Sequence, residues 1–428
     1  MWYKKSPIPA LCLLALIALS SLQSCVEDKC GATRTFIQFA PIYATAETFR
    51  NNAIVTEGPR EMLEPGKIYY YNNTLLINEV RQGIHVYDNS NPENPTAIAF
   101  INIPGNVDMA IKENILYADN FVDLLTIDIS DIMNPIVLDR EEEAMIIHGS
   151  HPTRGYLVGY NQTEATVDVN CDDIRFSQGF FNREDVVFVD QSTFENTNPS
   201  IGNFSNATGI SGSLARFAIV DDRLYTIDAT NLNVFDISNL SNPSNINEVN
   251  VGWNIETLFP YKDNLFVASQ TGLFIFDNSN PDNPTLASRF EHAEACDPVY
   301  VSEDIAYVTL RDGNDCRNTI NQLDVLDVSN IFNPRLLETF QMRNPHGLSI
   351  NGNTMYLCEG DFGLKIFDIE KTEEIADNLL SHIEDLHAVD VIYIGNNILL
   401  VIGEDGFHQY DVSDPSAPQR LSLIHVTR

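Results

Sequence analysis

The chain has 428 residues, of which 44% are hydrophobic and 10% aromatic, so it can bury a large core, and disordered, collagen-like and coiled-coil proteins are excluded. Its 60 acidic and 25 basic residues give a formal net charge of −35 at pH 7, which repels nucleic-acid phosphates and anionic lipid head groups. We therefore expect no nucleic-acid partner. Because so large a charge also opposes self-association, we expect a monomer.

Residues 1–24 have the features of a secretory signal. Lys4 and Lys5 precede an apolar run, 8–19, that is too short to span a membrane. The leader ends at Leu-Gln-Ser-Cys25, which resembles the lipobox of bacterial lipoproteins, where the cysteine is acylated with fatty acids such as palmitate and becomes the first mature residue. This resemblance implies lipidation at Cys25; cleavage nearby that leaves Cys25 a spare thiol is the alternative. No other stretch approaches the ~20 apolar residues of a spanning helix, so we expect this lipid to be the only membrane anchor.

The residues after the leader indicate where the protein is displayed. Glu27 and Asp28 resemble the short acidic tract that some Gram-negative lipoproteins use to reach the outer face of the outer membrane. We expect a surface-exposed outer-membrane lipoprotein of the cell envelope, with a periplasm-facing anchor as the alternative. Residues 25–65 are expected to form a tether and packing segment, because Phe36 and Phe39 argue against a wholly flexible linker.

One pattern then recurs along the chain: alternating apolar residues, an Asp, any residue, a Ser, and an Asn/Pro turn. The gap between Asp128 and Asp236 is 108 residues, far longer than the others, and we assign to it a worn copy of the unit around 155–169 plus an insertion at about 171–212. Each unit holds short β-branched and aromatic runs between turn residues, which predicts four strands and no sizeable helix. The repeated acids are Asp88, Asp128, Asp236, Asp277, Asp327, Asp368 and Asp411.

Four-stranded units of about 41 residues are typical of a β-propeller. In the unit that contains Asp327 we expect strands at 299–301, 305–310, 323–328 and 336–341. Residues 66–428, without the insertion and an extension of one unit, divide into eight such units. The sequence therefore predicts an all-β propeller of eight four-stranded antiparallel blades; seven blades is the alternative if the worn third unit is a loop.

The repeat resembles the LVIVD repeat family of bacterial surface propellers, whose units end in an Asp-x-Ser turn followed by Pro. The resemblance covers roughly residues 75–411, but the third unit lacks the turn, and Glu370 replaces Ser in the sixth signature, with no Pro after it. It implies a shape and no reaction. We expect each repeated Asp to accept backbone N–H groups of the following turn. No calcium-loop motif occurs, so no cofactor is predicted, although calcium elsewhere on this acidic surface stays open.

Five cysteines follow Cys25. Antiparallel strand order places Cys296 and Cys316 at the same end of one blade, and export would expose them to an oxidising compartment, so we predict a disulfide between them. The other three, Cys30, Cys171 and Cys358, have no assigned partner. No Cys-x-x-Cys occurs, so no zinc or other metal site is predicted.

Strand order also predicts a binding face. In every blade, the start of the first strand and the loop between the second and third strands lie at the same end, so together they form one face of the propeller. Loops on a rigid scaffold usually carry binding residues. Solvated loop residues and inter-blade hydrogen-bond partners are the alternative interpretation of this face. The candidate ligand-binding residues on it are His148, Arg216, Trp253, Arg311, Asp312, His346, Glu359, His387 and Glu404.

No catalytic motif is present: the chain has no Gly-x-Ser-x-Gly elbow, no His-Glu-x-x-His and no P-loop. We therefore expect a non-enzymatic binding or scaffold module for a protein, peptide or glycan, and no catalytic residue is assigned. The alternative is a propeller hydrolase or lyase that acts on extracellular polysaccharide, with Glu359 and Glu404 as paired acids.

Overall fold

The computed structural model describes residues 31–145, 151, 153–170, 180–183, 186–190, 214, 216–270, 272–291, 298–311 and 320–427. The chain divides into two compact units, the first made of the segments up to residue 40 and from 161 to 195, the second of all other residues. No helix among the described residues is long and apolar enough to cross a membrane. Cys25 and its leader lie outside the described residues.

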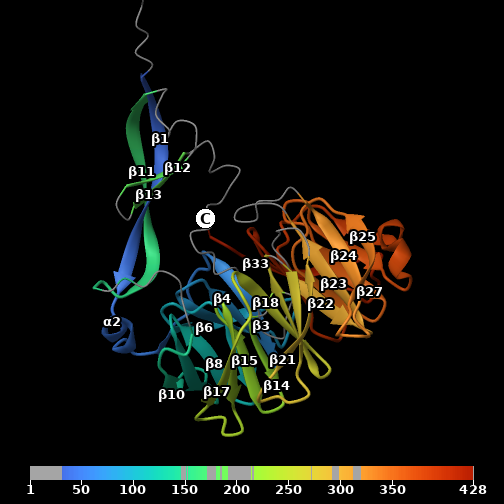
Figure 1. Cartoon of the computed structure of the whole chain (residues 1–428), viewed down its shortest axis with the longest axis horizontal. Coiled ribbons are helices and arrows are strands. Elements are labelled where there is room, and N and C mark those ends of the chain that lie inside the picture. The colour runs from blue at the N-terminus through green and yellow to red at the C-terminus, as the bar shows by residue number, and fades with distance from the viewer. Residues whose placement is uncertain are drawn as a thin grey trace, which may run out of the picture. The chain divides into compact units, whose positions relative to one another are not determined.

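The second unit is a β-propeller whose described part contains seven four-stranded antiparallel blades, with strands A to D of each blade consecutive in the chain (Figure 1). The strands are β3 Pro65–Tyr71, β4 Thr74–Glu79, β5 Gly83–Asp88 and β6 Thr96–Asn102 in blade 1; β7 Met109–Lys112, β8 Ile115–Asn120, β9 Asp123–Asp128 and β10 Ile136–Glu141 in blade 2; β14 Phe217–Val220, β15 Arg223–Ile227, β16 Asn231–Asp236 and β17 Ser244–Asn250 in blade 3; β18 Ile255–Tyr261, β19 Asn264–Ser269, β20 Gly272–Asp277 and β21 Thr285–Glu291 in blade 4; β22 Val299–Ser302, β23 Ile305–Leu310, β24 Gln322–Asp327 and β25 Arg335–Gln341 in blade 5; β26 Leu348–Asn351, β27 Thr354–Cys358, β28 Leu364–Asp368 and β29 Leu379–Ile383 in blade 6; and β30 Asp390–Tyr393, β31 Ile398–Gly403, β32 Gly406–Asp411 and β33 Gln419–His425 in blade 7.

The prediction of eight blades is wrong, and the stated alternative of seven is correct. Residues 155–169, which we assigned to a worn third blade, instead contribute to one long strand, β11 (Tyr156–Asn170). β11 pairs with β1 (Gly31–Ala44) in a separate sheet of order β11-β1-β13-β12, where β12 is Phe180–Arg183 and β13 is Val186–Asp190. The physical reason is the missing Asp-x-Ser turn: without a turn that folds the chain back, the alternating residues continue as one strand.

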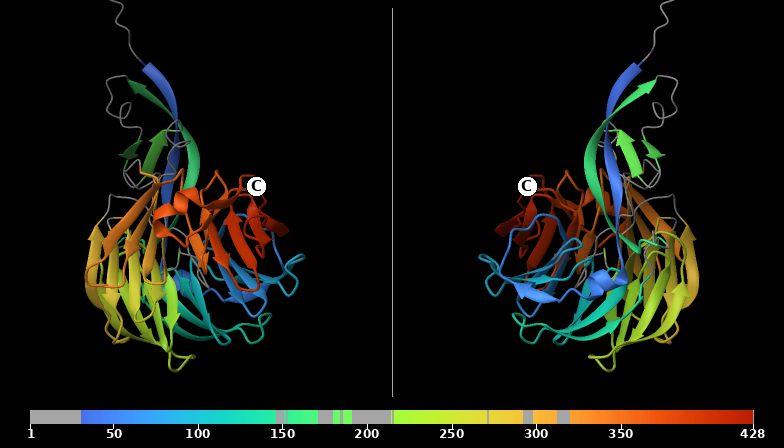
Figure 2. Two further views of the ribbon diagram at one scale, coloured as in Figure 1. Left: turned by 90° about the vertical axis from the view of Figure 1, so that its right-hand side faces the viewer. Right: turned by 90° about the vertical axis from the view of Figure 1, so that its left-hand side faces the viewer.

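The ring of blades is closed by apolar packing between the last blade and the first. Ile77 of β4 and Phe407 of β32 belong to one buried cluster, which unites blade 1 with blade 7. The N–H of Thr427, after the last strand, donates to the carbonyl of Met62, before the first blade, at 2.8 Å. Figure 2 shows the red strands of blade 7 beside the blue strands of blade 1. Among the described residues no strand is exchanged between the two blades, so closure depends on this packing, on the terminal segments and on side-chain hydrogen bonds such as that from Asn89 to Gln409 at 2.9 Å.

The repeated Asp has the predicted role in all seven blades. Its carboxylate accepts the backbone N–H of the residue two positions later at 2.8 to 3.0 Å. In blade 6 the donor is Glu370, which preserves the turn because the bond uses only the backbone, and a 3₁₀ helix, Thr372–Asp377, replaces the proline turn. Each strand C also bonds back to the A–B turn at 2.7 to 3.0 Å, so both turns lie on the same face of the propeller.

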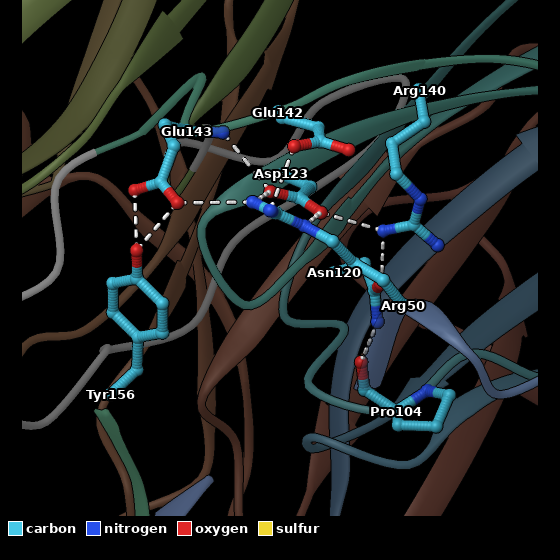
Figure 3. A network of polar contacts seen from close by, with 8 residues as sticks. All are labelled: Arg50, Pro104, Asn120, Asp123, Arg140, Glu142, Glu143 and Tyr156. Carbon is cyan, nitrogen blue, oxygen red and sulfur yellow. Dashed lines mark hydrogen bonds and ion pairs between the residues drawn. The ribbon is translucent and has the colours of Figure 1, made fainter. Parts of the chain in front are cut away.

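A charge network holds the segment before blade 1 against blade 2 (Figure 3). Arg50, at the end of helix α2 (Ala46–Arg50), donates to both oxygens of the buried Asp123 at 2.8 and 2.7 Å. Asp123 also accepts Arg140 at 2.8 Å and the backbone N–H of Glu143 at 3.0 Å. Arg50 forms further ion pairs with Glu142 at 2.8 Å and Glu143 at 3.0 Å. We call these five residues, Arg50, Asp123, Arg140, Glu142 and Glu143, the outer charge network.

Apolar contacts accompany this network. Phe49 is 2% exposed, and its ring centroid lies 5.0 Å from that of Phe121 and 6.0 Å from that of Tyr156. The hydroxyl of Tyr156 donates to the carboxylate of Glu143 at 2.6 Å. Residues 41–50 and 156–160, through which the chain connects the two units, are therefore both fixed to blade 2. Strand β2 (Val55–Glu57) then adds a fifth strand to blade 1 by pairing with β6.

Candidate functional site

Aligning the seven A strands by their pairing with the B strands places seven residues at one equivalent position near the start of the strand. The A strands of successive blades contact one another, so this position forms a ring on the inner side of the propeller. In blades 7, 1, 2 and 3 it carries alternating charges, and in blades 4 to 6 it carries none. The seven residues, from blade 1 to blade 7, are Lys67, Asp108, Arg216, Thr257, Pro298, Gly347 and Asp390.

The four charged residues, Asp390, Lys67, Asp108 and Arg216, are hereafter the inner charge row. The ammonium of Lys67 lies 3.3 Å from Asp108 Oδ2, which also accepts the backbone N–H of Arg216 at 2.9 Å. Lys67 and Asp108 are only 2% and 1% exposed, and burial lowers the pKa of Lys67 and raises that of Asp108. Asp390 is 4% exposed, and burial raises its pKa to about 7. Charges that are this buried lose hydration that neighbouring groups restore only in part.

The sequence prediction found only Arg216 among these four residues. Lys67, Asp108 and Asp390 were missed because they are common residue types in a strongly acidic chain. The signal that could have found them is their position: aligned A strands show a charge in four neighbouring blades where the other three have Thr, Pro and Gly.

A second group of candidate residues comes together on the same face, where blades 5, 6 and 7 meet. Burial holds the pKa of His346 well below its usual range, and the charges of Arg311 and His387 lower it further. The backbone N–H of Glu404 donates to His387 Nδ1 at 3.1 Å. The structure thus gathers Arg311, His346, His387 and Glu404 in one region, which we call the blade 5–7 rim.

Glu359 has a structural role instead. It is 0% exposed; its Oε1 accepts the backbone N–H of Arg343 at 2.7 Å, and its Oε2 pairs with the ammonium of Lys365 at 2.6 Å. Glu79 has the same structural role in blade 1, where it accepts the backbone N–H of Glu64 at 2.7 Å. Both glutamates hold the loop that leads into the A strand of their own blade.

The remaining candidates are scattered or lie outside the described residues. Trp253 lies in the loop that enters blade 4 and is 73% exposed. Cys358 is a free cysteine, fully buried in the core between blades 6 and 7, and burial raises the pKa of its thiol well above its usual value. His148, Asp312 and the predicted Cys296–Cys316 disulfide fall outside the described residues, as do Cys30 and Cys171.

Comparison with known proteins supports the repeat and the fold. The LVIVD repeat model matches residues 215–251, 261–292 and 294–341. No curated protein is significantly similar to the chain. Among solved structures, the computationally designed Ika8 protein aligns over 87% of this chain and 90% of its own, with a TM-score of 0.51 and 11% identity. A Lactobacillus plantarum protein aligns over 84% and 98%, with a TM-score of 0.50 and 11% identity.

BamB from Moraxella catarrhalis aligns over 87% of this chain and 96% of its own, with a TM-score of 0.48 and 10% identity. Identities this low concern the arrangement of strands and leave ligand and activity open. The repeat match, the seven Asp turns and the closed ring of four-stranded sheets agree with one another. The chain therefore contains LVIVD repeats, and the part that the structure describes folds as a seven-bladed β-propeller.

Proposed function

We propose that this chain is an exported, lipid-anchored binding or scaffold module of the cell envelope, and that it captures a protein, peptide or glycan on the face where its A strands begin. The observation that carries the proposal is the difference between the two faces. On one face all seven blades repeat the same Asp turn. On the other, equivalent positions carry different residues, including the inner charge row.

This difference separates residues that serve the fold from residues that serve a ligand. A turn that every blade needs recurs in every blade, because the same hydrogen bonds must be made each time. Folding alone gives no reason for Lys67, Asp108, Arg216 and Asp390 to replace the uncharged residues that suffice in blades 4 to 6. Buried charges of this kind mark functional sites in many proteins.

Export and lipid anchoring rest on the leader and Cys25, and surface display rests on Glu27 and Asp28. The polysaccharide hydrolase alternative finds no support in the arrangement of its proposed acids. The carboxylate of Glu359 is buried, accepts the backbone N–H of Arg343 and forms an ion pair with Lys365, so a glycoside cannot reach it as the fold stands. We therefore retain the binding module.

Anchoring is tested with the Cys25→Ala variant in cells. We expect the wild-type chain to incorporate labelled palmitate and to be removed from intact cells by an added protease. Cys25→Ala should lose the label and leave the membrane fraction. A wild-type chain that keeps its leader, or that protease cannot reach, would contradict export or surface display respectively.

Binding is tested by capture from intact cells with two matched aromatic variants. Trp253→Ala removes a side chain that is 73% exposed on the proposed binding face, and Phe332→Ala removes one that is 65% exposed in a C–D turn of the opposite face. Truncating a central aromatic contact typically weakens binding by about tenfold or more. We expect Trp253→Ala to reduce partner recovery and Phe332→Ala to leave it unchanged. Equal recovery with both variants would contradict the assignment of the face.

A further inference from the structure

We infer that the blade 5–7 rim is a binding site for an oxyanion, the carboxylate, sulfate or phosphate group of a ligand. The site is built from side-chain nitrogens of Asn344, His346 and His387 around Gly360, with the charge of Arg311 within electrostatic reach. The inference deepens the proposed function, because it names a ligand class for the same face. It is argued from the rim alone and does not depend on export or anchoring.

Backbone hydrogen bonds fix the rim before any ligand arrives. The N–H of His346 donates to the carbonyl of Cys358 at 2.8 Å, which ties the loop before β26 to the end of β27. Gly360 and Ala388 exchange two backbone bonds, at 2.8 and 3.0 Å, which ties the B–C loop of blade 6 to the chain entering blade 7. Since His387 precedes Ala388, both histidines are carried by rigid backbone.

Two side-chain nitrogens lie directly over Gly360, the amide donor of Asn344 and Nε2 of His346. A Cβ atom built on this glycine would lie 2.7 Å from Asn344 Nδ2 and 3.0 Å from His346 Nε2. Both distances are shorter than real side chains tolerate, so the absence of a side chain at position 360 is what allows the two nitrogens to come so close. Gly360 also has a left-handed φ of +55°, which favours glycine.

The tautomer of His387 adds a further donor. Its Nδ1 accepts the N–H of Glu404 at 3.1 Å, which requires the ring proton of the neutral form to be on Nε2. The carboxylate oxygen Asp361 Oδ1 lies 3.7 Å from His387 Nε2, which is beyond hydrogen-bond distance, and the side chain of Asp361 is 88% exposed. Nε2 of His387 can therefore donate to a ligand.

The rim concentrates donors and positive charge on a protein with a net charge of −35. Arg311 supplies a permanent charge, and its effect on the pKa of His346, together with that of His387, shows that the three groups lie within electrostatic reach. In the described part of the chain, neither ring nitrogen of His346 has a hydrogen-bond partner. An anion can accept hydrogen bonds from these nitrogens and is attracted by the charge of Arg311, which favours an oxyanion over a cation.

The experiment is calorimetric titration of the purified chain with sodium sulfate, phosphate and acetate at constant ionic strength. We expect saturable binding of at least one of these anions, with a dissociation constant of about 1 mM or below. Gly360→Ala should weaken it at least tenfold, because the added methyl group must displace Asn344 and His346. Gly352→Ala is the matched control: it lies in the same blade with a φ of +56°, but a Cβ there meets nothing within 4 Å. It should strain the backbone equally and leave binding unchanged.

A second pair of variants tests the donor itself. His387→Asn keeps an oxygen that can accept the N–H of Glu404 but removes the Nε2 donor, so binding should weaken several-fold while the fold is retained. His425→Asn changes an exposed histidine of β33 and should have no effect. Because the isolated chain is titrated, failure here is distinct from failure to capture a partner from cells. The inference is overturned by a folded wild-type chain that binds none of the anions, by equal binding in the two glycine variants, or by saturable binding of Zn²⁺ alone.

Discussion

The outer charge network and the inner charge row both bury aspartates, yet they treat the carboxylate in opposite ways. Asp123 of the outer network accepts hydrogen bonds from Arg50, from Arg140 and from the N–H of Glu143. Asp390 of the inner row accepts one, from the N–H of Val391 at 2.9 Å. Burial alone does not decide whether a carboxylate stabilises a fold; the balance between burial and the hydrogen bonds and charges of its donors does.

The direction of the pKa shift follows from the balance between burial and these donors. Burial pushes the pKa of Asp123 upward, but the hydrogen bonds and charges of Arg50, Glu143 and Arg140 outweigh burial and hold it below its usual value. Burial raises the pKa of Asp390 to about 7. The hydrogen bond from the N–H of Val391 and the charge of Lys67 lower the pKa, but by less than burial raises it. At neutral pH the outer network therefore stabilises the fold, whereas Asp390 destabilises it and is retained for another reason, which we propose to be binding.

The largest expected effect is the loss of the outer network. Asp123→Ala removes the carboxylate and leaves two partly buried guanidinium groups facing each other, so we expect the free energy of unfolding to fall by about 3 to 5 kcal/mol. Equilibrium unfolding in urea at pH 7 measures the change. Asp131→Ala, which removes an exposed Asp of the blade 2 turn, is the control and should have a much smaller effect. A loss below about 1 kcal/mol for Asp123→Ala would mean that the network does not hold this segment.

Asp390→Asn should have the opposite sign. Because the folded-state pKa of about 7 exceeds the unfolded value of 3.8, the folded protein binds more protons between these pH values, and its stability falls as pH rises through this window. Asn can still accept the N–H of Val391 but carries no charge. We expect the variant to be more stable than the wild type by about 4 kcal/mol at pH 8, and by little at pH 4.

Unfolding in urea at both pH values measures this difference. Asp123→Asn, measured in parallel, should be less stable than the wild type at pH 8, because the depressed pKa keeps Asp123 charged and paired. If Asp390→Asn also destabilised at pH 8, the contrast between the two regions would be wrong.

A contrast between local and long-range interactions also explains which parts of the fold could be predicted from the sequence. The Asp turns were predictable because each is local, set by residues within two positions of one another. The strands of blade 5 were predicted to within one residue for the same reason. The number of blades was not, because spacing alone counted residues 155–169 as a unit, whereas their pairing with β1 joins segments more than a hundred residues apart.

The candidate site residues show the same difference between features set by local sequence and features set by long-range contacts. Unusual residue types pointed to Arg311, His346 and His387, which the structure places together. They also pointed to Glu359, whose role is set by the backbone of Arg343 and is invisible without the loop geometry. The outer charge network joins Arg50 to Asp123, which is an ordinary acid in the sequence and becomes recognisable only through the fold.

The smallest expected effect concerns Glu142, the most exposed residue of the outer charge network. Glu142 pairs with Arg50 at 2.8 Å, but its side chain is 59% exposed, so water and salt screen the pair. Glu142→Gln should therefore lower the free energy of unfolding by less than about 1 kcal/mol, and the difference should vanish in concentrated salt. The measurement is urea unfolding at low and high ionic strength, with Glu93→Gln, in the exposed turn of blade 1, as the control for lost charge. If Glu142→Gln lowered the free energy of unfolding by more than this, and the difference persisted in concentrated salt, then Asp123 would not be the only residue on which the stability of the network depends.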